Sequence, residues 1–232
     1  RGYLGVTLES VKPEFAKVYG MREAKGAILM ELRDLKGAAA AAGLKSGDVI
    51  VDFDGKPVES AQDLIAKVSG TAPDQAVAVN YLREAGSSLE RRTATLRLGE
   101  RPIDPRNAAD EPTPVKLPLD RRTEDIKPFG LTLTDLPADI ASLYKMEGQK
   151  GVLVKEINPE SFIADVKAST GNQALGEGDL IVKINRLPVT DVRSFTAIVN
   201  SLKQGDAVVL HVLALNPRSR TADLKIVQFS VQ

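Results

Sequence analysis

The sequence Gly47-Asp48-Val49-Ile50-Val51 occurs a second time in this chain, with one aliphatic exchange, as Gly178-Asp179-Leu180-Ile181-Val182. Each copy is followed by a proline–valine pair, first Pro57-Val58 and then Pro188-Val189. A Gly-Asp turn that leads into an apolar, β-branched run is typical of a turn before a buried strand. Because the Gly-Asp run and the Pro-Val pair after it recur in the same order, the chain is predicted to contain two copies of one structural unit.

The repeat continues toward the N-terminal side of each copy. Gly5-Val6-Thr7-Leu8 matches Gly130-Leu131-Thr132-Leu133, and the spacing between these two runs is 125 positions. The Gly-Asp runs lie 131 positions apart, so the second copy carries about six extra residues. We assign that insertion to residues 169–173.

Each copy has the same predicted order of elements. Alternating apolar residues predict an opening strand at 4–8 and at 129–133. After the Gly-Asp strand, a helix is predicted at 60–69 and at 191–202, and two final strands close each copy. Short helical segments are predicted before the Gly-Asp strand of each copy, including one at 161–166. The predicted fold class is α+β: two small, mostly antiparallel β-sandwiches or partial barrels, each with two helices.

The predicted domains are residues 1–100 and 127–232, joined by a proline-rich linker at 101–126. Six of the chain's 13 prolines fall between Pro102 and Pro128, where no apolar period is sustained. Such a composition favours an extended, partly stiff spacer. The two domains are therefore expected to unfold as separate units and to move relative to each other.

Composition excludes several classes of function. Lys plus Arg equals Asp plus Glu, 31 each, so no global charge points to nucleic acid or to an anionic membrane. The chain has no cysteine, which excludes disulfides, thiolate metal sites and cysteine nucleophiles. No apolar run approaches the roughly 18 residues that a membrane-spanning helix needs, so no membrane insertion by this chain is expected.

No catalytic, metal-binding or cofactor-binding residues are predicted. A Ser-His-Asp triad needs a histidine, and the chain's one histidine, His211, lies inside an apolar strand pattern. Neither a Gly-x-Ser-x-Gly elbow nor a His-Glu-x-x-His motif occurs. We therefore expect no peptidase activity from this chain itself.

Two segments carry a resemblance to a known family. Arg1-Gly2-Tyr3-Leu4-Gly5-Val6 resembles the carboxylate-binding loop of PDZ domains in the bacterial HtrA/Do serine proteases, the DegP- and DegQ-like proteins. Residues 42–50, Ala-Gly-Leu-Lys-Ser-Gly-Asp-Val-Ile, resemble a second signature of that family. The resemblance identifies the chain as tandem PDZ domains without a protease domain. Because the binding strand opens each copy, it resembles the permuted bacterial form.

The resemblance implies a peptide-binding site in each copy. The backbone amides of Leu4, Gly5 and Val6 would receive a C-terminal carboxylate, as converging amides in a tight loop can. Strand residues two apart share a face, and helix residues at i, i+4 and i+7 do so too. The expected site residues of the first copy are Tyr3, Leu4, Gly5, Val6, Leu8, Ala61, Ile65 and Val68.

The second copy has the corresponding set, with two departures. Pro128 replaces Tyr3 and removes an N–H group, and Thr196 replaces Ile65 and makes the site more polar. Peptide binding and a purely structural or docking role are therefore both open for this copy. The expected residues are Phe129, Gly130, Leu131, Leu133, Val192, Thr196 and Val199.

The resemblance also implies a biological role. The parent protein would be a periplasmic, trypsin-like serine endopeptidase of protein quality control and the stress response, with its protease domain upstream. The partners would be C-terminal peptides of unfolded or regulatory proteins. Two alternatives stay open: the tandem PDZ region of a membrane-embedded site-two metalloprotease, and a scaffold without any protease. The coding sequence upstream of Arg1 would discriminate them.

Overall fold

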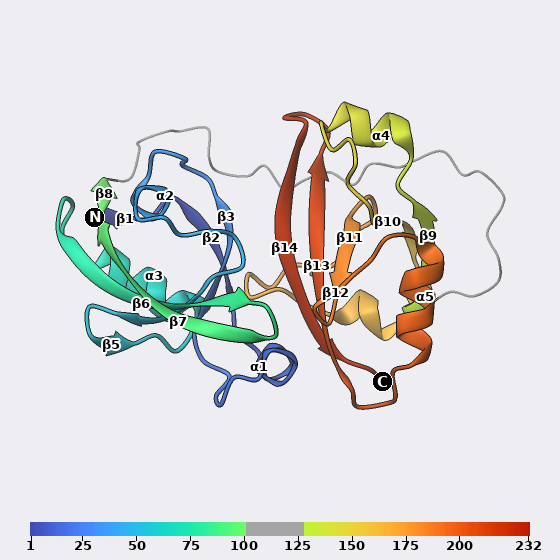
Figure 1. The fold of residues 1–232 in the computed structure, drawn as a ribbon, viewed down its shortest axis with the longest axis horizontal. Helices are drawn as coiled ribbons and strands as arrows, with labels where there is room; N and C mark the ends of the chain where they lie inside the picture. The colour runs from blue at the N-terminus through green and yellow to red at the C-terminus, as the bar shows by residue number, and fades with distance from the viewer. Residues whose placement is uncertain (101–127) are drawn as a thin grey trace. The chain divides into compact units, whose positions relative to one another are not determined.

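The computed structural model describes residues 1–100 and 128–232. Its contacts divide the chain into two compact units, which comprise the described residues up to 100 and from 128 onward. Figure 1 colours the first unit blue to green and the second yellow to red. The predicted linker at 101–126 lies outside the described residues, and so does residue 127, the predicted start of the second domain.

The first unit is an open, mostly antiparallel sheet with three helices. Its strands follow the order β2-β3-β4-β6-β7, with the short β5 paired to β4, while β1 and β8 form a separate two-stranded ladder. The elements are β1 Gly2–Tyr3, β2 Val6–Ser10, α1 Pro13–Tyr19, β3 Ala27–Leu32, α2 Ala38–Ala41, β4 Val49–Phe53, β5 Lys56–Pro57, α3 Ala61–Ser69, β6 Ala76–Ala85, β7 Ser88–Arg97 and β8 Gly99–Glu100.

The second unit repeats this plan. Its strands follow the order β14-β13-β11-β10-β9, with β12 paired to β11, so β9 takes the edge position that β2 has in the first unit. The elements are η1 Pro128–Gly130, β9 Leu131–Asp135, α4 Ala138–Leu143, β10 Val152–Ile157, η2 Phe162–Asp165, β11 Leu180–Ile184, β12 Leu187–Pro188, α5 Val192–Asn200, β13 Ala207–Asn216 and β14 Thr221–Ser230.

The long helix of each unit is fixed at its start by local capping and at its middle by burial. The Ser60 hydroxyl accepts a hydrogen bond from the Asp63 N–H, and Asp191 and Ser194 form a reciprocal capping box. Such caps satisfy amides that the helix leaves without a partner. Leu64 and Phe195, at equivalent positions, are fully buried and anchor α3 and α5 to their cores.

The predicted α+β class with mostly antiparallel strands is confirmed. The sheets are open rather than closed into barrels, because β2 and β7 end one sheet and β9 and β14 end the other. The first unit has three α-helices, not two. The insertion predicted at 169–173 forms a tight turn, closed by a bridge between Lys167 and Gln173 with Gly171 at a φ of 87°.

Candidate functional site: an edge strand beside a helix

The loop between β1 and β2 is held from both sides. Tyr3 pairs with Gly99 in the β1–β8 ladder, and the Gly5 carbonyl accepts hydrogen bonds from the N–H groups of Arg33 (2.8 Å) and Asp34 (3.1 Å). Gly5 has a φ of 70°, and a Cβ built on it would lie 2.8 Å from the Asp34 Cβ. Glycine is therefore required here both by the backbone conformation and by the close approach of the next loop.

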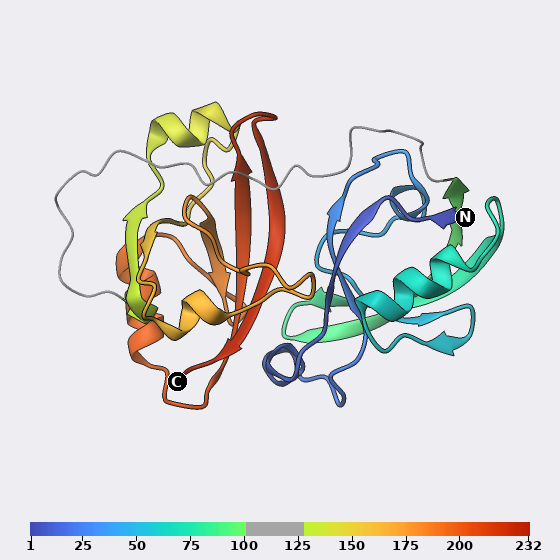
Figure 2. The same ribbon diagram turned by 180° about the vertical axis from the view of Figure 1, so that it is seen from behind.

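The strand that follows this loop lies at the edge of its sheet. Among the described residues, β2 pairs with β3 alone, over Val6–Ser10. The outer side of an edge strand presents N–H and C=O groups that can pair with another extended chain. The helix α3 contacts β2, and Figures 1 and 2 both show the two side by side.

The predicted site residues of the first unit differ in how far their side chains are exposed to solvent. Ile65 is 54% exposed. Val6 and Leu8 are half-buried and pack against the core, and Tyr3 is half-buried as well. Leu4, Ala61 and Val68 are buried. Of these residues, Ile65 is therefore the one large apolar side chain on α3 that is mostly open to solvent, whereas Leu4, Ala61 and Val68 belong to the core.

The helix α3 also carries an ion pair on its surface. Lys67 and Asp63 form an ion pair one turn apart, at 2.5 Å between Nζ and Oδ1. The hydrogen bond from Lys67, together with one from the Glu59 N–H, lowers the pKa of Asp63 below its usual value. This pair follows the spacing of four residues that favours ion pairs on a helix surface.

Three exposed large apolar residues among the described residues were not predicted from the sequence, and one of them, Leu35, lies near the β1–β2 turn. Leu35 is 80% exposed and follows Asp34, whose N–H is bonded to Gly5. It therefore lies in the loop that holds the β1–β2 turn in place. A single apolar residue between Asp34 and Lys36 in a polar stretch was the available signal, but only the fold brings it near the turn.

The turn at the start of the second unit has a different conformation. Phe129 and Gly130 both have positive φ, 56° and 71°. The Phe129 carbonyl accepts from the Ser161 hydroxyl (2.5 Å), and the Gly130 carbonyl accepts from the Asn158 N–H (3.0 Å). Pro128 is buried and has no N–H to offer.

An aromatic cluster fills the space behind this turn. The Phe129 ring packs edge-on against Phe229 and Phe162, with centroid distances of 5.3 and 5.9 Å, and its centroid lies 6.3 Å from that of Phe195. Edge-to-face pairs of this kind add stability beyond their buried area. Among the predicted site residues, Leu131 and Leu133 are buried, and those on α5 are half-buried: Val192, Thr196 and Val199. The second unit thus keeps the edge strand, but an aromatic side chain of its turn is packed into the core.

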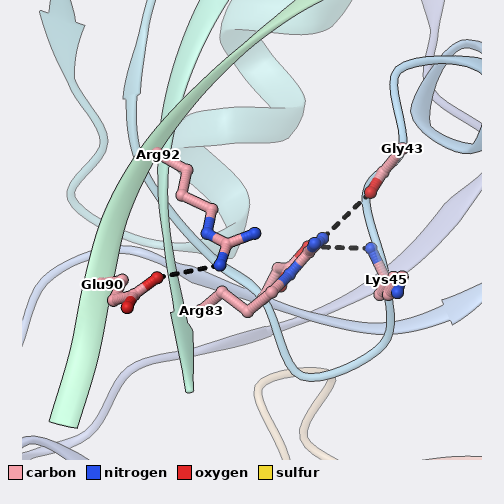
Figure 3. Close-up of polar contacts among 6 residues, drawn as sticks. Gly43, Lys45, Arg83, Glu90 and Arg92 are labelled. Carbon is pink, nitrogen blue, oxygen red and sulfur yellow. Dashed lines mark hydrogen bonds and ion pairs between the residues drawn. The ribbon is translucent and has the colours of Figure 1, made fainter. Parts of the chain in front are cut away.

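The repeated Gly-Asp motif has a structural role in both units. The buried Asp48 carboxylate accepts from the Lys45 N–H (2.8 Å) and from two nitrogens of Arg83, Nε at 2.8 Å and Nη2 at 2.7 Å. Arg83 also donates to the Gly43 carbonyl, as Figure 3 shows. The hydrogen bonds to Asp48 raise the pKa of the Arg83 guanidinium. The motif therefore secures the loop before β4 rather than a ligand.

The second copy of the motif uses another cation. Asp179 accepts from the Gly176 N–H (2.8 Å) and from Lys225 Nζ (2.6 Å). Burial raises the pKa of Asp179, and the neighbouring Lys225 opposes that shift. Arg83 lies on β6, the first strand of its hairpin, whereas Lys225 lies on β14, the second strand. The aspartate therefore recurs at the same place in both copies, but the basic residue that pairs with it comes from a different strand in each.

Other chemistry finds no support among the described residues. Within residues 1–100 and 128–232, no group of three or more His, Cys, Asp or Glu side chains could hold a metal ion. His211 is half-buried in β13, paired in the ladder with Ile226. No helix in these ranges is long and apolar enough to cross a membrane.

Comparison with known proteins agrees with this geometry. The family model described as a PDZ domain matches residues 2–96. A probable periplasmic serine endoprotease, DegP-like, of Brucella suis biovar 1 (strain 1330) is 31% identical over 229 residues, covering 98% of this chain and 40% of the relative. The protein of the same description in Pseudomonas fulva (strain 12-X) is 28% identical over 215 residues, covering 92% and 40%.

Among solved structures, the HtrA-type protease AlgW with a decapeptide is 30% identical, with a TM-score of 0.38, covering 45% of this chain and 30% of AlgW. The chain spans about 40% of the length of the curated relatives that it matches. The first unit therefore matches the PDZ domain family, and the chain as a whole is similar to a part of the DegP-like relatives that amounts to about 40% of their length.

Proposed function

We propose that the first unit binds the free C-terminal end of another polypeptide by adding it as a strand to β2. The observation that carries this proposal is the position of β2 at the sheet edge, between the Gly5 turn and α3. Main-chain hydrogen bonds along such an edge supply affinity, and neighbouring side chains supply selectivity. PDZ domains as a class bind peptides in this way.

The β1–β2 turn and the apolar residues near it determine which last residue of a ligand would fit. The terminal carboxylate would be received by the amides of Leu4, Gly5 and Val6, in a turn that Gly5 and Asp34 keep tight. The last side chain would be apolar, since the half-buried Val6 follows the turn and α3, which carries the exposed Ile65, contacts β1 and β2. Burying a valine or leucine side chain there contributes about 1.5–3 kcal/mol.

A side chain two places before the terminus would be selected by shape and apolar area. Ala61, which opens α3, has a methyl group that neither donates nor accepts a hydrogen bond. No hydroxyl on the ligand would therefore find a side-chain partner at that residue. The ligand class is an apolar C-terminal segment, as unfolded polypeptides expose.

The second unit is assigned a weaker part in binding. Its edge strand β9 lies beside α5, but Pro128 removes an amide, and the Phe129 side chain of the turn is packed into the aromatic cluster. Peptide recognition by the whole chain would therefore depend mainly on the first unit.

The names of the relatives support one setting for this activity. They are described as periplasmic serine endoproteases. The chain would then serve as the substrate-recognition region of an HtrA-type serine endopeptidase in the periplasm, where it would tether unfolded proteins and help regulate their cleavage. This setting is favoured over a site-two metalloprotease or a protease-free scaffold by those descriptions.

The exposed position of Ile65 allows a clean test. The chain is titrated with an acetylated tetrapeptide that ends in a free valine carboxylate, and backbone amide signals of β2 and β9 are followed by NMR. Ile65→Asp should weaken binding at β2 about tenfold or more, because a carboxylate would face the apolar side chain and the ligand terminus. Ala66→Asp, exposed on the same helix, is the matched control. Equal binding by wild type and Ile65→Asp would refute the proposal.

A further inference from the structure

In both units, the last residue of the edge strand is hydrogen-bonded to the first amide of the long helix. The Ser10 hydroxyl at the end of β2 accepts from the Ala61 N–H at 3.0 Å, and it donates to Gln62 Oε1 at 3.2 Å. The Asp135 carboxylate at the end of β9 accepts from the Val192 N–H at 2.7 Å. We call this pair of contacts the strand–helix tether.

The tether is distinct from the helix caps. Ser60 and Asp191, the residues just before the helices, already cap the amides of Asp63 and Ser194. The tether instead takes the first helical amide, and the group that takes it comes from a strand more than 50 positions away. A hydroxyl does this in one unit and a carboxylate in the other. The contact therefore recurs although the side chain that makes it does not.

The register of antiparallel pairing determines which residue of the proposed ligand would meet the strand–helix tether. In antiparallel pairing, each step along one strand is matched by one step back along the other. With the terminal residue of the ligand opposite Val6, the third residue from the end is opposite Leu8 and the fifth is opposite Ser10. Paired strands lie about 4.8 Å apart, so a peptide backbone cannot pass between two atoms that are 3.0 Å apart.

We infer that Ser10 in the first unit, and Asp135 in the second, set the length of peptide that each edge strand accepts. This inference rests on the proposed function. Up to about four terminal residues pair with the tether intact, and a longer peptide gains further pairing only after the tether opens. Opening costs the hydrogen bond of Ala61, which corresponds to about a threefold to tenfold change in affinity. The charged Asp135 contact costs more.

The test compares two acetylated peptides with one C-terminal sequence, three and seven residues long. Both are titrated into the 232-residue chain, and dissociation constants for the first unit are read from the amide signals of Thr7 and Leu8. In the wild type, the tripeptide and the heptapeptide should bind within about twofold of each other. In Ser10→Ala, the heptapeptide should gain roughly threefold to tenfold relative to the tripeptide. Ser10→Thr keeps the hydroxyl and should restore the wild-type ratio.

The outcomes separate the inference from the function on which it rests. If the ratio of the tripeptide and heptapeptide dissociation constants is the same in wild type, Ser10→Ala and Ser10→Thr, the inference is overturned, while peptide binding at β2 remains established. A heptapeptide that already binds the wild type more than tenfold tighter than the tripeptide would overturn it as well. Absence of binding by either peptide to any of the three proteins would refute both. Asp135→Ala, read from Thr132 and Leu133, repeats the comparison in the second unit.

Discussion

Gly5 shows how a single residue links the fold to the proposed site. Its left-handed conformation turns the chain from β1 into β2, and its carbonyl is held by the amides of Arg33 and Asp34. With the carbonyl fixed toward the neighbouring loop, the peptide groups around it are fixed as well. The geometry of the turn therefore depends on the absence of one methyl group.

Replacing Gly5 with alanine should impair both stability and binding. The left-handed conformation costs a residue with a Cβ about 1–2 kcal/mol, and the new Cβ would meet the Asp34 side chain at 2.8 Å. The free energy of unfolding should fall by that amount or more, and affinity for a C-terminal peptide should fall about tenfold. Chemical denaturation and peptide titration measure the two effects.

Gly86→Ala provides the matched control for this substitution. Gly86 also has a positive φ, 60°, but no atom lies within 4 Å of a Cβ built there. It lies in the turn between β6 and β7, away from β2 in the sheet order. Strain alone should lower its stability while peptide affinity stays at the wild-type value. A loss of affinity equal to that of Gly5→Ala would show that the effect is not local to the β1–β2 turn.

The repeated aspartates illustrate what could not be predicted at the residue scale. The Gly-Asp motif was visible in the sequence, but the cations that pair with it come from different strands. Which residue faces Asp48 depends on the register of β4 with β6, which sequence alone leaves open. The cations that pair with the two buried aspartates could therefore be identified only from the fold.

The elements themselves were largely predictable because their signals are local. The helix predicted at 60–69 is α3, Ala61–Ser69, and Ser60 caps it. The strand predicted at 129–133 instead begins at Leu131, because Phe129 and Gly130 adopt left-handed conformations that no alternation pattern reveals. The segment predicted as helix at 161–166 is a 3-10 turn, Phe162–Asp165. Turn chemistry, not hydrophobic period, decided both differences.

At the element scale, the Asp48–Arg83 pair joins the loop before β4 to β6. Asp48 is buried and Arg83 is half-buried, and hydrogen bonds to charged groups contribute about 1.5–3 kcal/mol each. Asp48→Asn should therefore destabilise the first unit by about that amount, measured by chemical denaturation. Arg92→Met, which removes the nearby exposed pair with Glu90 in Figure 3, should change stability by less than about 1 kcal/mol. Equal effects would contradict a structural role for the motif.

Each unit has its own hydrophobic core. Leu64 and Phe53 are central to the first, and Phe195 and Ile184 to the second, with a further cluster around Tyr144. Because each core is complete within its unit, we predict two unfolding transitions for the whole chain. Asp48→Asn should lower only one of them and Asp179→Asn only the other, as followed by residue-resolved hydrogen exchange. A single transition that both variants shift equally would contradict this prediction.

The central claim for the whole molecule is that β2 accepts a chain end, not merely an extended segment. The most direct test titrates the 232-residue chain with one acetylated tetrapeptide ending in valine, as the free acid and as the C-terminal amide. Amidation removes the charge that the Leu4, Gly5 and Val6 amides would receive, and charge-assisted hydrogen bonds are worth about 1.5–3 kcal/mol each. The Thr7 and Leu8 amide signals should report binding of the free acid at least about tenfold tighter than that of the amide. Equal affinity of the two peptides would contradict the account.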